Sequence, residues 1–449
     1  MDHRLEPPGR NSPEAMRKNN WIESLVFRLG DRALQRDFYS NYRQLEKEHS
    51  LSDREKAALL ETRWEYLCDF ARKNIPFYKD YFSSRIDETI NLSEFPVLLK
   101  EDLREKQEAY RVATTPEKQL YYSKTGGSTA EPLTIPMYRS ERDRWLAYQL
   151  LFWKKGGYRA GDPTIQIGVT PRTFSAKCKD LFLNVTYVHT NQLSDAHIGN
   201  LLNGIRRGKY LHLIGYPSRI KAFYRMAERY FGNESLTLKS IICIGDKIMD
   251  EDREQWMKRF GATVVETYGA TEGVVLGCAL NSPLIDCDAS DFIVEILDED
   301  NRPVSDGKVG YITVTNLIAR YLPLIRYRIG DLGAWVKKGD KKYLRIIGRV
   351  DERLQLQSGA YLTVRDVFRY LSTEWKIDHY TLTNGESGYI LGYIRDEAIQ
   401  PPEIPKLMTG IRDQLGLPIE KLERMDKVKR YPSGKPLYFD LSHKQVRQG

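Results

Sequence analysis

Apolar residues recur at helical spacing in the first part of the chain. The stretch "SDREKAALLETRWEYLCDFARKN" opens on a Ser-Asp pair, repeats apolar residues at intervals that match a helix, and stops before Pro76. Ser and Asp favour the start of a helix, whereas a proline commonly follows its end. The pattern therefore predicts a helical lead-in that extends to about residue 80.

From about Pro163 onward, the pattern changes to short β-branched or apolar runs that alternate with helical stretches. The runs are "TIQIGV", "LHLIGY", "SIICIG" and "TVVETYG", and the helical stretches include "PSRIKAFYRMAERYF" and "DEDREQWMKRF". Strand patterns separated by helical patterns are typical of an α/β sheet. We therefore expect this part of the chain to form one.

Two further changes of pattern follow toward the C-terminus. The stretch "FIVEILDEDNRPVSDGKVGYITVTN" reads as strand, acidic turn and strand, which indicates an antiparallel or barrel-like section after the sheet. After "LRIIGRVDERLQLQSG", helix and strand patterns mix again, as in "VRDVFRYLSTEW" and "GYILGYIR". This tail is long enough for a separate domain of about 100 residues.

Composition narrows the class of protein. The chain has 449 residues, of which 41% are hydrophobic and 29% charged, so it has large buried cores and two or three domains. Its formal charge of +8 is spread among interleaved acidic residues, which favours a small anionic substrate over nucleic acid. No apolar run approaches a membrane span, and the opening lacks a signal peptide, so we expect a cytoplasmic protein. The five cysteines form no CxxC pair, so no zinc site or disulfide framework is indicated.

The stretch "YYSKTGGSTAEP", from Tyr121 to Pro132, is the first candidate for chemistry. A turn rich in Gly, Ser and Thr offers backbone N–H groups and hydroxyls that can converge on phosphate oxygens. It is not a Walker loop, because GxxxxGK[ST] occurs nowhere in the chain. A plain surface turn, or a hydrolase elbow built on Gly126, Ser128 and Ala130, remains open at this point.

Four other stretches add candidates: "ETYGATEG", "PLIRYRIGDLG", "IIGRVDERLQLQSG" and "YPSGKPL". In "YGATE" an aromatic ring, a hydroxyl and a carboxylate could stack a base, bind phosphate and hold magnesium, although such residues at a strand end are often structural. Asp331 could accept both hydroxyls of a ribose, or form a salt bridge with Arg326 or Arg328. Lys435 stands on a Ser-Gly turn, where a lysine is often merely solvated.

The order and spacing of these stretches resemble the adenylate-forming superfamily of acyl-CoA synthetases, adenylation domains and luciferases. The resemblance covers nearly the whole chain and is carried by "ARKNIPFYKDYF", "TGGSTAEP", "IGDKI" before "YGATEG", "PLIRYRIGDL" and "GRVDERL". Within the superfamily, the chain is most similar to phenylacetate-CoA ligase-like proteins, a branch that includes members linked to capsular polysaccharide biosynthesis. The resemblance implies a large N-terminal α/β domain with a barrel-like section, residues 1–348, and a small mobile C-terminal α+β domain, residues 349–449.

The resemblance also implies roles for individual residues. The loop would hold the triphosphate of ATP through Thr125, Gly126, Gly127, Ser128 and Thr129. The nucleotide would further contact Gly245, Tyr268, Gly269, Asp331 and Arg349, with Tyr268 against adenine and Asp331 on the ribose. Thr271 would contact the α-phosphate, Glu272 would bind Mg²⁺, and Lys435 would bridge the acyl carboxylate and the α-phosphate. Asp351 would be the hinge, and Tyr216 would line the acyl pocket.

These roles imply an ATP-dependent, AMP-forming ligase that activates a carboxylic acid as an acyl-adenylate. Its acceptor would be a thiol, with CoA expected, or an amine or carrier protein. Family members often have a His in the segment after "YGATEG", whereas this chain has "CALNSPLIDCD", which leaves the transfer to CoA open. The alternatives are an adenylyltransferase that passes AMP to an acceptor and a non-catalytic nucleotide-binding scaffold.

Overall fold

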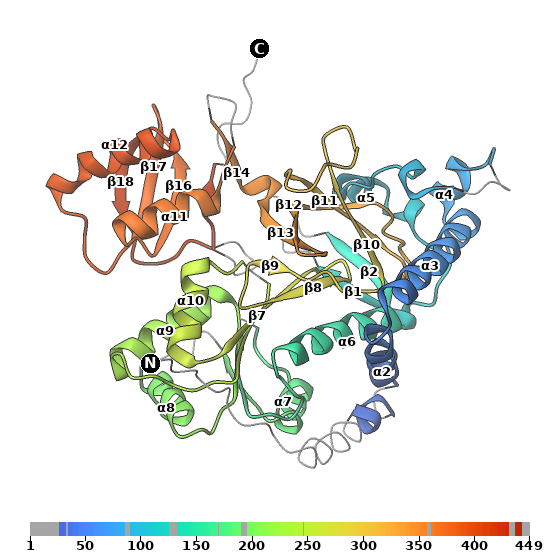
Figure 1. Ribbon diagram of the computed structural model, residues 1–449, viewed down its shortest axis with the longest axis horizontal. Coiled ribbons are helices and arrows are strands. Elements are labelled where there is room, and N and C mark those ends of the chain that lie inside the picture. The colour runs from blue at the N-terminus through green and yellow to red at the C-terminus, as the bar shows by residue number, and fades with distance from the viewer. Residues whose placement is uncertain are drawn as a thin grey trace.

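The computed structural model describes residues 27–32, 35–85, 90–124, 133–168, 170–189, 195–245, 247–356, 361–430 and 436–441. These residues form a large N-terminal part, built on a six-stranded and a five-stranded sheet with the small β1–β2 pair, and a smaller C-terminal part (Figure 1). The predicted α/β fold class is confirmed.

The helical lead-in is confirmed. It consists of α2 (Phe38–His49), α3 (Asp53–Asn74) and α4 (Pro76–Tyr81). Ser52 and Glu55 form a capping box at the start of α3, in which each side chain binds the other residue's backbone N–H. The helix ends before Pro76, which itself opens α4. The sequence signals that predicted α3 therefore set both of its ends.

Short elements lead from these helices into the first sheet. They are η1 (Leu92–Glu94), α5 (Lys100–Lys106), η2 (Gln107–Tyr110), η3 (Glu117–Gln119), the antiparallel pair β1 (Leu120–Lys124) and β2 (Thr134–Tyr138), and α6 (Arg139–Lys155). The segment predicted to bind phosphate joins β1 to β2.

A six-stranded sheet follows in the order β4-β3-β5-β6-β7-β8, parallel except for the antiparallel β7–β8 pair. Its strands are β3 (Thr164–Gly168), β4 (Val185–His189), β5 (His212–Gly215), β6 (Ser240–Cys243), β7 (Thr263–Ala270) and β8 (Val274–Leu280). The connecting helices are α7 (Phe174–Phe182), α8 (Asp195–Arg206), α9 (Pro217–Phe231) and α10 (Asp250–Phe260).

Side-chain alternation in these strands explains why both faces are covered. Leu213, Ile241 and Val264 pack in one core with α8, α9 and α10. Their neighbours Ile214, Ile242 and Val265 pack in a second core with α6 and the lead-in helices. Because successive strand residues point to opposite faces, apolar runs without alternation require helices on both sides.

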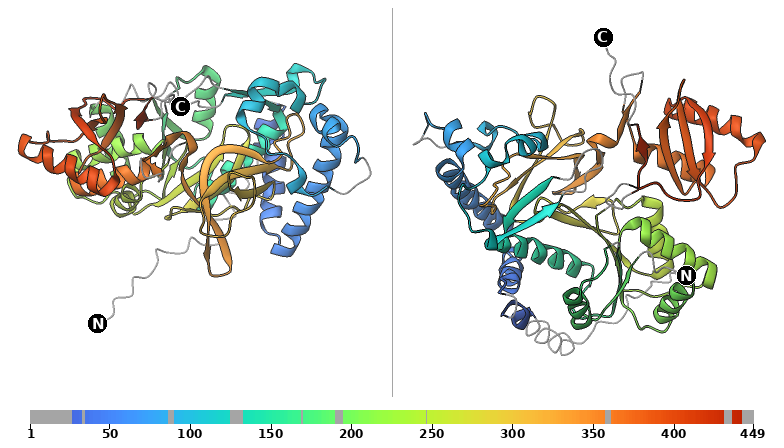
Figure 2. Two further views of the ribbon diagram at one scale, coloured as in Figure 1. Left: turned by 90° about the horizontal axis from the view of Figure 1, so that it is seen from above. Right: turned by 180° about the vertical axis from the view of Figure 1, so that it is seen from behind.

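The predicted barrel-like section is a five-stranded antiparallel sheet in the order β10-β11-β12-β13-β9 (Figure 2). Its strands are β9 (Leu284–Ile285), β10 (Phe292–Leu297), β11 (Gly310–Asn316), β12 (Tyr327–Lys338) and β13 (Lys341–Arg349). Buried residues of this sheet share a core with α6 and the lead-in helices, so the N-terminal part packs as one body.

The C-terminal part has its own core around a four-stranded sheet in the order β18-β17-β16-β19. Its elements are η5 (Val350–Glu352), β14 (Arg353–Gln355), β15 (Tyr361–Thr363), α11 (Val364–Trp375), β16 (His379–Asn384), β17 (Tyr389–Ile394), η6 (Pro401–Glu403), α12 (Ile404–Leu415), β18 (Ile419–Arg424) and β19 (Phe439–Asp440). Met249, at the start of α10, is the member of this core that comes from the N-terminal part. The boundary between residues 348 and 349 stays a prediction.

None of the helices in the described ranges combines the length and apolar character needed to cross a bilayer. All five cysteines are free thiols; Cys68, Cys243 and Cys278 are buried, and Cys178 and Cys287 are partly buried.

Candidate active site

Several predicted site residues lie at one edge of the six-stranded sheet. Tyr216 follows the end of β5, Gly245 follows the end of β6, and Tyr268 lies near the end of β7. The turn that holds Thr271 and Glu272 comes directly after β7. Because β5, β6 and β7 run parallel, these positions share the carboxyl edge, where α/β sheets commonly bind ligands.

Two glycines at this edge are fixed by close packing. Gly245 has φ +71°, and a Cβ there would lie 2.7 Å from Cε1 of Tyr216, so that ring rests directly on the backbone. At Gly269, a Cβ would lie 2.3 Å from the carbonyl oxygen of Val274 in the adjacent strand. Both positions therefore have a structural need for glycine, whatever they bind.

Asp331 lies across from the sheet edge and contacts Tyr268. The Tyr268 hydroxyl donates a hydrogen bond to Oδ2 of Asp331 at 2.7 Å. Arg349, paired with Asp331 in the β12–β13 register, places Nη1 3.5 Å from Oδ1. Burial and the neighbouring carboxylate raise the pKa of Tyr268 well above its ordinary value, so its hydroxyl remains a donor. The structure thus gathers three residues that the sequence placed at the nucleotide.

The alternative partners considered for Asp331 are wrong. Arg326 forms its ion pair with Glu295, with 3.1 Å between Nε and Oε2, and donates to backbone carbonyls. Arg328 donates to the carbonyl oxygen of Asp298 at 3.0 Å. Both arginines are engaged elsewhere because they face the β10–β11 side of the antiparallel sheet.

Glu272 is buried, with 8% of its surface exposed. Its Oε1 accepts a hydrogen bond from the Tyr327 hydroxyl at 3.1 Å, and its Oε2 accepts one from the Thr271 hydroxyl at 3.3 Å. Both donors are neutral, and in the described part of the chain no lysine, arginine or histidine forms an ion pair with this carboxylate. A nearly buried carboxylate whose charge is left uncompensated suits a cation.

Magnesium fits this carboxylate on chemical grounds. Among the described residues, no group of three or more potential ligands gathers around one point. Mg²⁺ is commonly bound by one or two carboxylates together with substrate phosphates, rather than by a complete protein cage. If Mg²⁺ bound here, Glu272 would provide one protein ligand, and a nucleotide would have to supply others.

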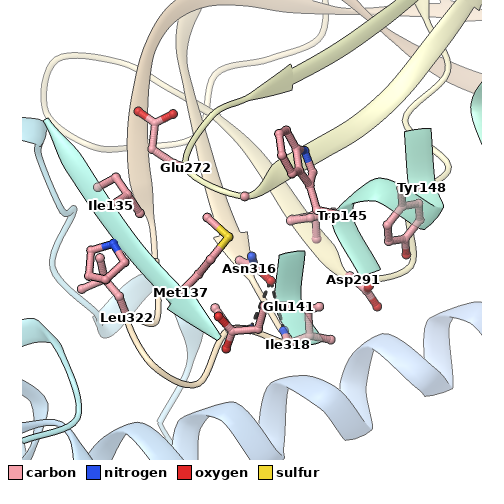
Figure 3. A pocket seen from close by; sticks show the side chains of 14 residues that line it. Ile135, Met137, Glu141, Trp145, Tyr148, Glu272, Asp291, Asn316, Ile318 and Leu322 are labelled. Atoms are coloured by element: carbon pink, nitrogen blue, oxygen red, sulfur yellow. Dashed lines mark hydrogen bonds between the residues drawn. The ribbon is translucent and has the colours of Figure 1, made fainter. Parts of the chain in front are cut away.

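A narrow pocket lies directly beside Glu272 (Figure 3). Apolar side chains line most of it, including Met137 and Trp145, and Asp291 and Tyr148 lie at the end away from Glu272. Tyr216, predicted for the acyl pocket, does not line it. The Glu141 carboxylate accepts backbone N–H groups from Tyr138, Arg320 and Tyr321, so it is already satisfied.

Several predicted site residues lie outside the described residues. These are the phosphate-loop residues Thr125, Gly126, Gly127, Ser128 and Thr129, together with Lys435. Asp351 has a described backbone, within the short helix η5, but its side chain is not described. The roles given to these residues stay predictions.

Tyr327 is the contributor that sequence reasoning missed. It stands in "RYRIGD", a stretch in which roles were predicted only for the charged residues. A usable signal was present, because "YGATE" and "YRIGD" both place a tyrosine four positions before a carboxylate.

The amino-acid sequence is similar to that of known enzymes. Residues 83–317, more than half of the chain, match the AMP-binding enzyme family. Protein CapK of Staphylococcus aureus is 21% identical over 83% of this chain and 86% of its own length. Phenylacetate-coenzyme A ligase of Escherichia coli (strain K12) is 23% identical over 75% of this chain and 80% of its own length.

Solved structures of 2-hydroxyisobutyryl-CoA ligase share the fold. Two structures in the postadenylation state have TM-scores of 0.67 and 0.68, with 18% and 17% identity. They cover 89% and 88% of this chain and 92% and 91% of theirs. The same ligase in an open conformation with CoA and in the thioesterification state scores 0.54 in both cases, at 18% identity. These last two cover 84% and 88% of this chain and 89% and 91% of theirs.

Proposed function

Because the chain belongs to the AMP-binding enzyme family and is an AMP-forming carboxylate ligase, we propose that it converts a small carboxylic acid into its CoA thioester through an acyl-adenylate. The observation that carries this proposal is the cluster of Tyr268 and Glu272, at the carboxyl edge of the six-stranded sheet, with Asp331, which faces them from β12 of the antiparallel sheet. That cluster offers a ring for a base, a carboxylate for a ribose and a carboxylate for a cation.

The first half-reaction needs a positioned nucleotide rather than a protein nucleophile. A carboxylate oxygen of the acid attacks the α-phosphorus of ATP, the bond to the β-phosphate oxygen breaks, and pyrophosphate leaves. Asp331 and Tyr268 hold the nucleoside, while Thr271 and the loop from Thr125 to Thr129 contact the phosphates. Glu272 would hold a cation, which when bound would supply charge that offsets the phosphate oxygens. By its predicted role, Lys435 would bring its ammonium between the acid and the α-phosphate.

In the second half-reaction, the thiol of CoA attacks the acyl carbonyl carbon and AMP leaves. We place the two steps in different positions of the small domain, with the boundary at Arg349 and the hinge at Asp351. In support, the chain matches the postadenylation structures of 2-hydroxyisobutyryl-CoA ligase better than the thioesterification structure of the same ligase, with TM-scores of 0.67 and 0.68 against 0.54. We propose that the present arrangement of the two domains corresponds to the state after adenylate formation. These reactions use ATP and CoA, so the cytoplasm remains the expected location.

The acceptor is tested by product analysis. Once an acid that supports adenylation is found, the enzyme receives that acid, ATP and Mg²⁺ with CoA, with free amino acids or with an acyl carrier protein. We expect one acyl-CoA for each AMP, measured by chromatography and mass spectrometry. An amide in place of the thioester would assign an amine acceptor. An AMP-modified product would support the adenylyltransferase, which the similarity to a CoA ligase does not favour.

A further inference from the structure

Two tyrosine-to-carboxylate hydrogen bonds cross between the turn "YGATE" and the strand "YRIGD". Tyr268 of the first segment donates to Asp331 of the second at 2.7 Å. In the opposite direction, Tyr327 of the second segment donates to Glu272 of the first at 3.1 Å. Each segment therefore contributes one donor and one acceptor, and the two bonds are reciprocal.

The crossing joins two separate sheets. Tyr268 belongs to β7 of the six-stranded sheet, whereas Tyr327 and Asp331 belong to β12 of the antiparallel sheet. Gly330, with φ +87°, bends β12 just before Asp331, and a Cβ there would lie 3.2 Å from Nη2 of Arg349. The position of one carboxylate relative to the other thus depends on contacts across the gap between the sheets.

We propose that Tyr268 and Tyr327 are positioning residues. We call their two reciprocal hydrogen bonds, from Tyr268 to Asp331 and from Tyr327 to Glu272, the brace. The Tyr327 hydroxyl orients Glu272 toward the cation, and the Tyr268 hydroxyl orients Asp331 toward the ribose. This inference rests on the proposed function, since it takes the two carboxylates as the cation and ribose ligands. It assigns to the Tyr268 hydroxyl a role apart from that of its ring.

The state of each group supports the brace. Tyr327 is fully buried, and its hydroxyl donates to Oε1 of Glu272 at 3.1 Å. At Asp331, Oδ2 accepts a hydrogen bond from Tyr268 at 2.7 Å, whereas Oδ1 accepts a long one from Arg349 at 3.5 Å and keeps lone-pair capacity for a ribose hydroxyl. A carboxylate held by a buried donor loses the freedom to rotate away from its ligand.

The test removes only the hydroxyls. Tyr268→Phe and Tyr327→Phe each keep the ring, and isothermal titration calorimetry measures the binding of ATP and 2′-deoxy-ATP at several Mg²⁺ concentrations. Mg²⁺ should strengthen ATP binding, and the Mg²⁺ midpoint is the concentration at which half of this gain in affinity is reached. We expect Tyr327→Phe to raise the Mg²⁺ midpoint by about tenfold. Its preference for ATP over 2′-deoxy-ATP should stay that of the wild type. Tyr268→Phe should reduce that preference by about tenfold and leave the Mg²⁺ midpoint unchanged.

Tyr380→Phe is the matched control. Its hydroxyl donates to the carbonyl oxygen of Val364 at 2.9 Å within the small domain, far from both carboxylates in sequence and sheet. Thermal melting of all three variants reports loss of structure separately from loss of binding. The control should bind both nucleotides as the wild type does.

Two results would overturn the brace. One is a Mg²⁺ curve of Tyr327→Phe that overlaps the wild-type curve, and the other is an equal change of both parameters in both variants. Either result leaves the proposed function standing, provided that the wild type binds ATP with a Mg²⁺ dependence and a ribose preference. A wild type that binds no ATP would overturn the brace and the proposed function together.

Discussion

His379 shows how one buried side chain sets a response to pH. It is 5% exposed in β16, and its Nε2 has no hydrogen-bond partner among the described residues. Burial, with added repulsion from Arg430 and Lys221, lowers its pKa to about 3. An unfolded chain protonates this histidine near pH 6.5, whereas the folded chain does not, so folding loses stability as the pH falls below that value.

We expect this residue alone to lower the stability of the small domain by about 2 kcal/mol between pH 7 and pH 5. His379→Phe keeps a ring beside Tyr438 and removes the titration. Urea unfolding at several pH values would measure the difference between variant and wild type. The expected result is a shallower loss of stability in the variant, and parallel pH profiles would refute it.

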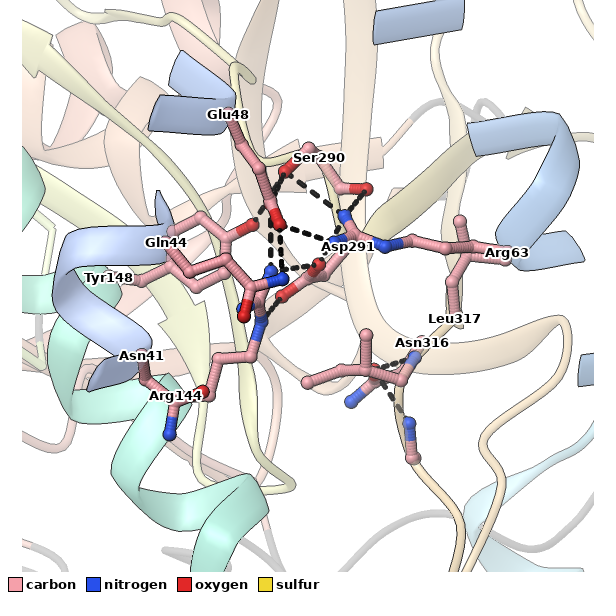
Figure 4. Close-up of polar contacts among 12 residues, drawn as sticks. Asn41, Gln44, Glu48, Arg63, Arg144, Tyr148, Ser290, Asp291, Asn316 and Leu317 are labelled. Atoms are coloured by element: carbon pink, nitrogen blue, oxygen red, sulfur yellow. Dashed lines mark hydrogen bonds and ion pairs between the residues drawn. The ribbon is translucent and has the colours of Figure 1, made fainter. Parts of the chain in front are cut away.

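At the scale of elements, a buried ion network ties three helices to the antiparallel sheet (Figure 4). Arg63 of α3 and Arg144 of α6 each bind both Glu48 of α2 and Asp291, one residue before β10, at 2.5–2.8 Å. Asp291 is fully buried, and the Arg144 and Glu48 side chains are less than one-tenth exposed. Each charge therefore faces two opposite charges, which offsets the cost of burying all four.

Asp291→Asn should lower the free energy of unfolding by roughly 3–5 kcal/mol, because it leaves the buried Arg144 and the partly buried Arg63 short of negative charge. Asp69→Asn serves as the control, since Asp69 pairs with Lys73 on the exposed face of α3 at 2.7 Å. That exposed pair should contribute less than about 1 kcal/mol. Chemical denaturation compares the two variants, and equal small losses would show that the network contributes little.

Elements whose signals are local were predictable from the sequence. The ends of α3 follow from Ser52, Glu55 and Pro76, and the strands from apolar runs bounded by helices. The antiparallel β7–β8 pair and the two-residue strand β9, which pairs with β13, were not predicted. The β9–β13 pairing joins Ile285 to Leu344, far apart in the chain, and no local periodicity specifies it. The β7–β8 pair is a local hairpin closed by residues 271–273, a turn for which only a chemical role was predicted.

The residues of the candidate site could be named from the sequence, but the contacts among them could not. The sequence placed Tyr268, Glu272 and Asp331 at one nucleotide, and the structure brings them to facing edges of two sheets. Tyr327 was missed because a tyrosine in a strand is usually core, and only the tertiary structure shows that its hydroxyl reaches Glu272. The alternative prediction, a salt bridge of Asp331 with Arg326 or Arg328, was wrong because these sequence neighbours bind other groups.

At the scale of the whole molecule, the small domain contacts the large one beside α9 and α10. Arg225 of α9 forms an ion pair with Asp378, and Met249 packs into the core of the small domain. Lys221 also lies over the ring of Phe368, 5.0 Å from its centre. These contacts border an open cleft between α9, α10 and α11.

Arg225→Asp should release the small domain, because it sets two negative charges against each other in a half-buried contact. The double variant Arg225→Asp with Asp378→Arg restores the opposite charges and should restore the docking. Small-angle X-ray scattering of the nucleotide-free protein would show a larger radius of gyration for the single variant alone. A single variant that scatters like the wild type would mean that this ion pair does not hold the domain.

The most direct test of the central claim is ATP–pyrophosphate exchange with a panel of aromatic and aliphatic carboxylic acids. The account predicts exchange that requires an acid, ATP and Mg²⁺ together, and that falls strongly in Asp331→Ala, which has lost the ribose acceptor. Transfer of AMP to a phosphate or hydroxyl acceptor, with no acid-dependent exchange, would contradict it.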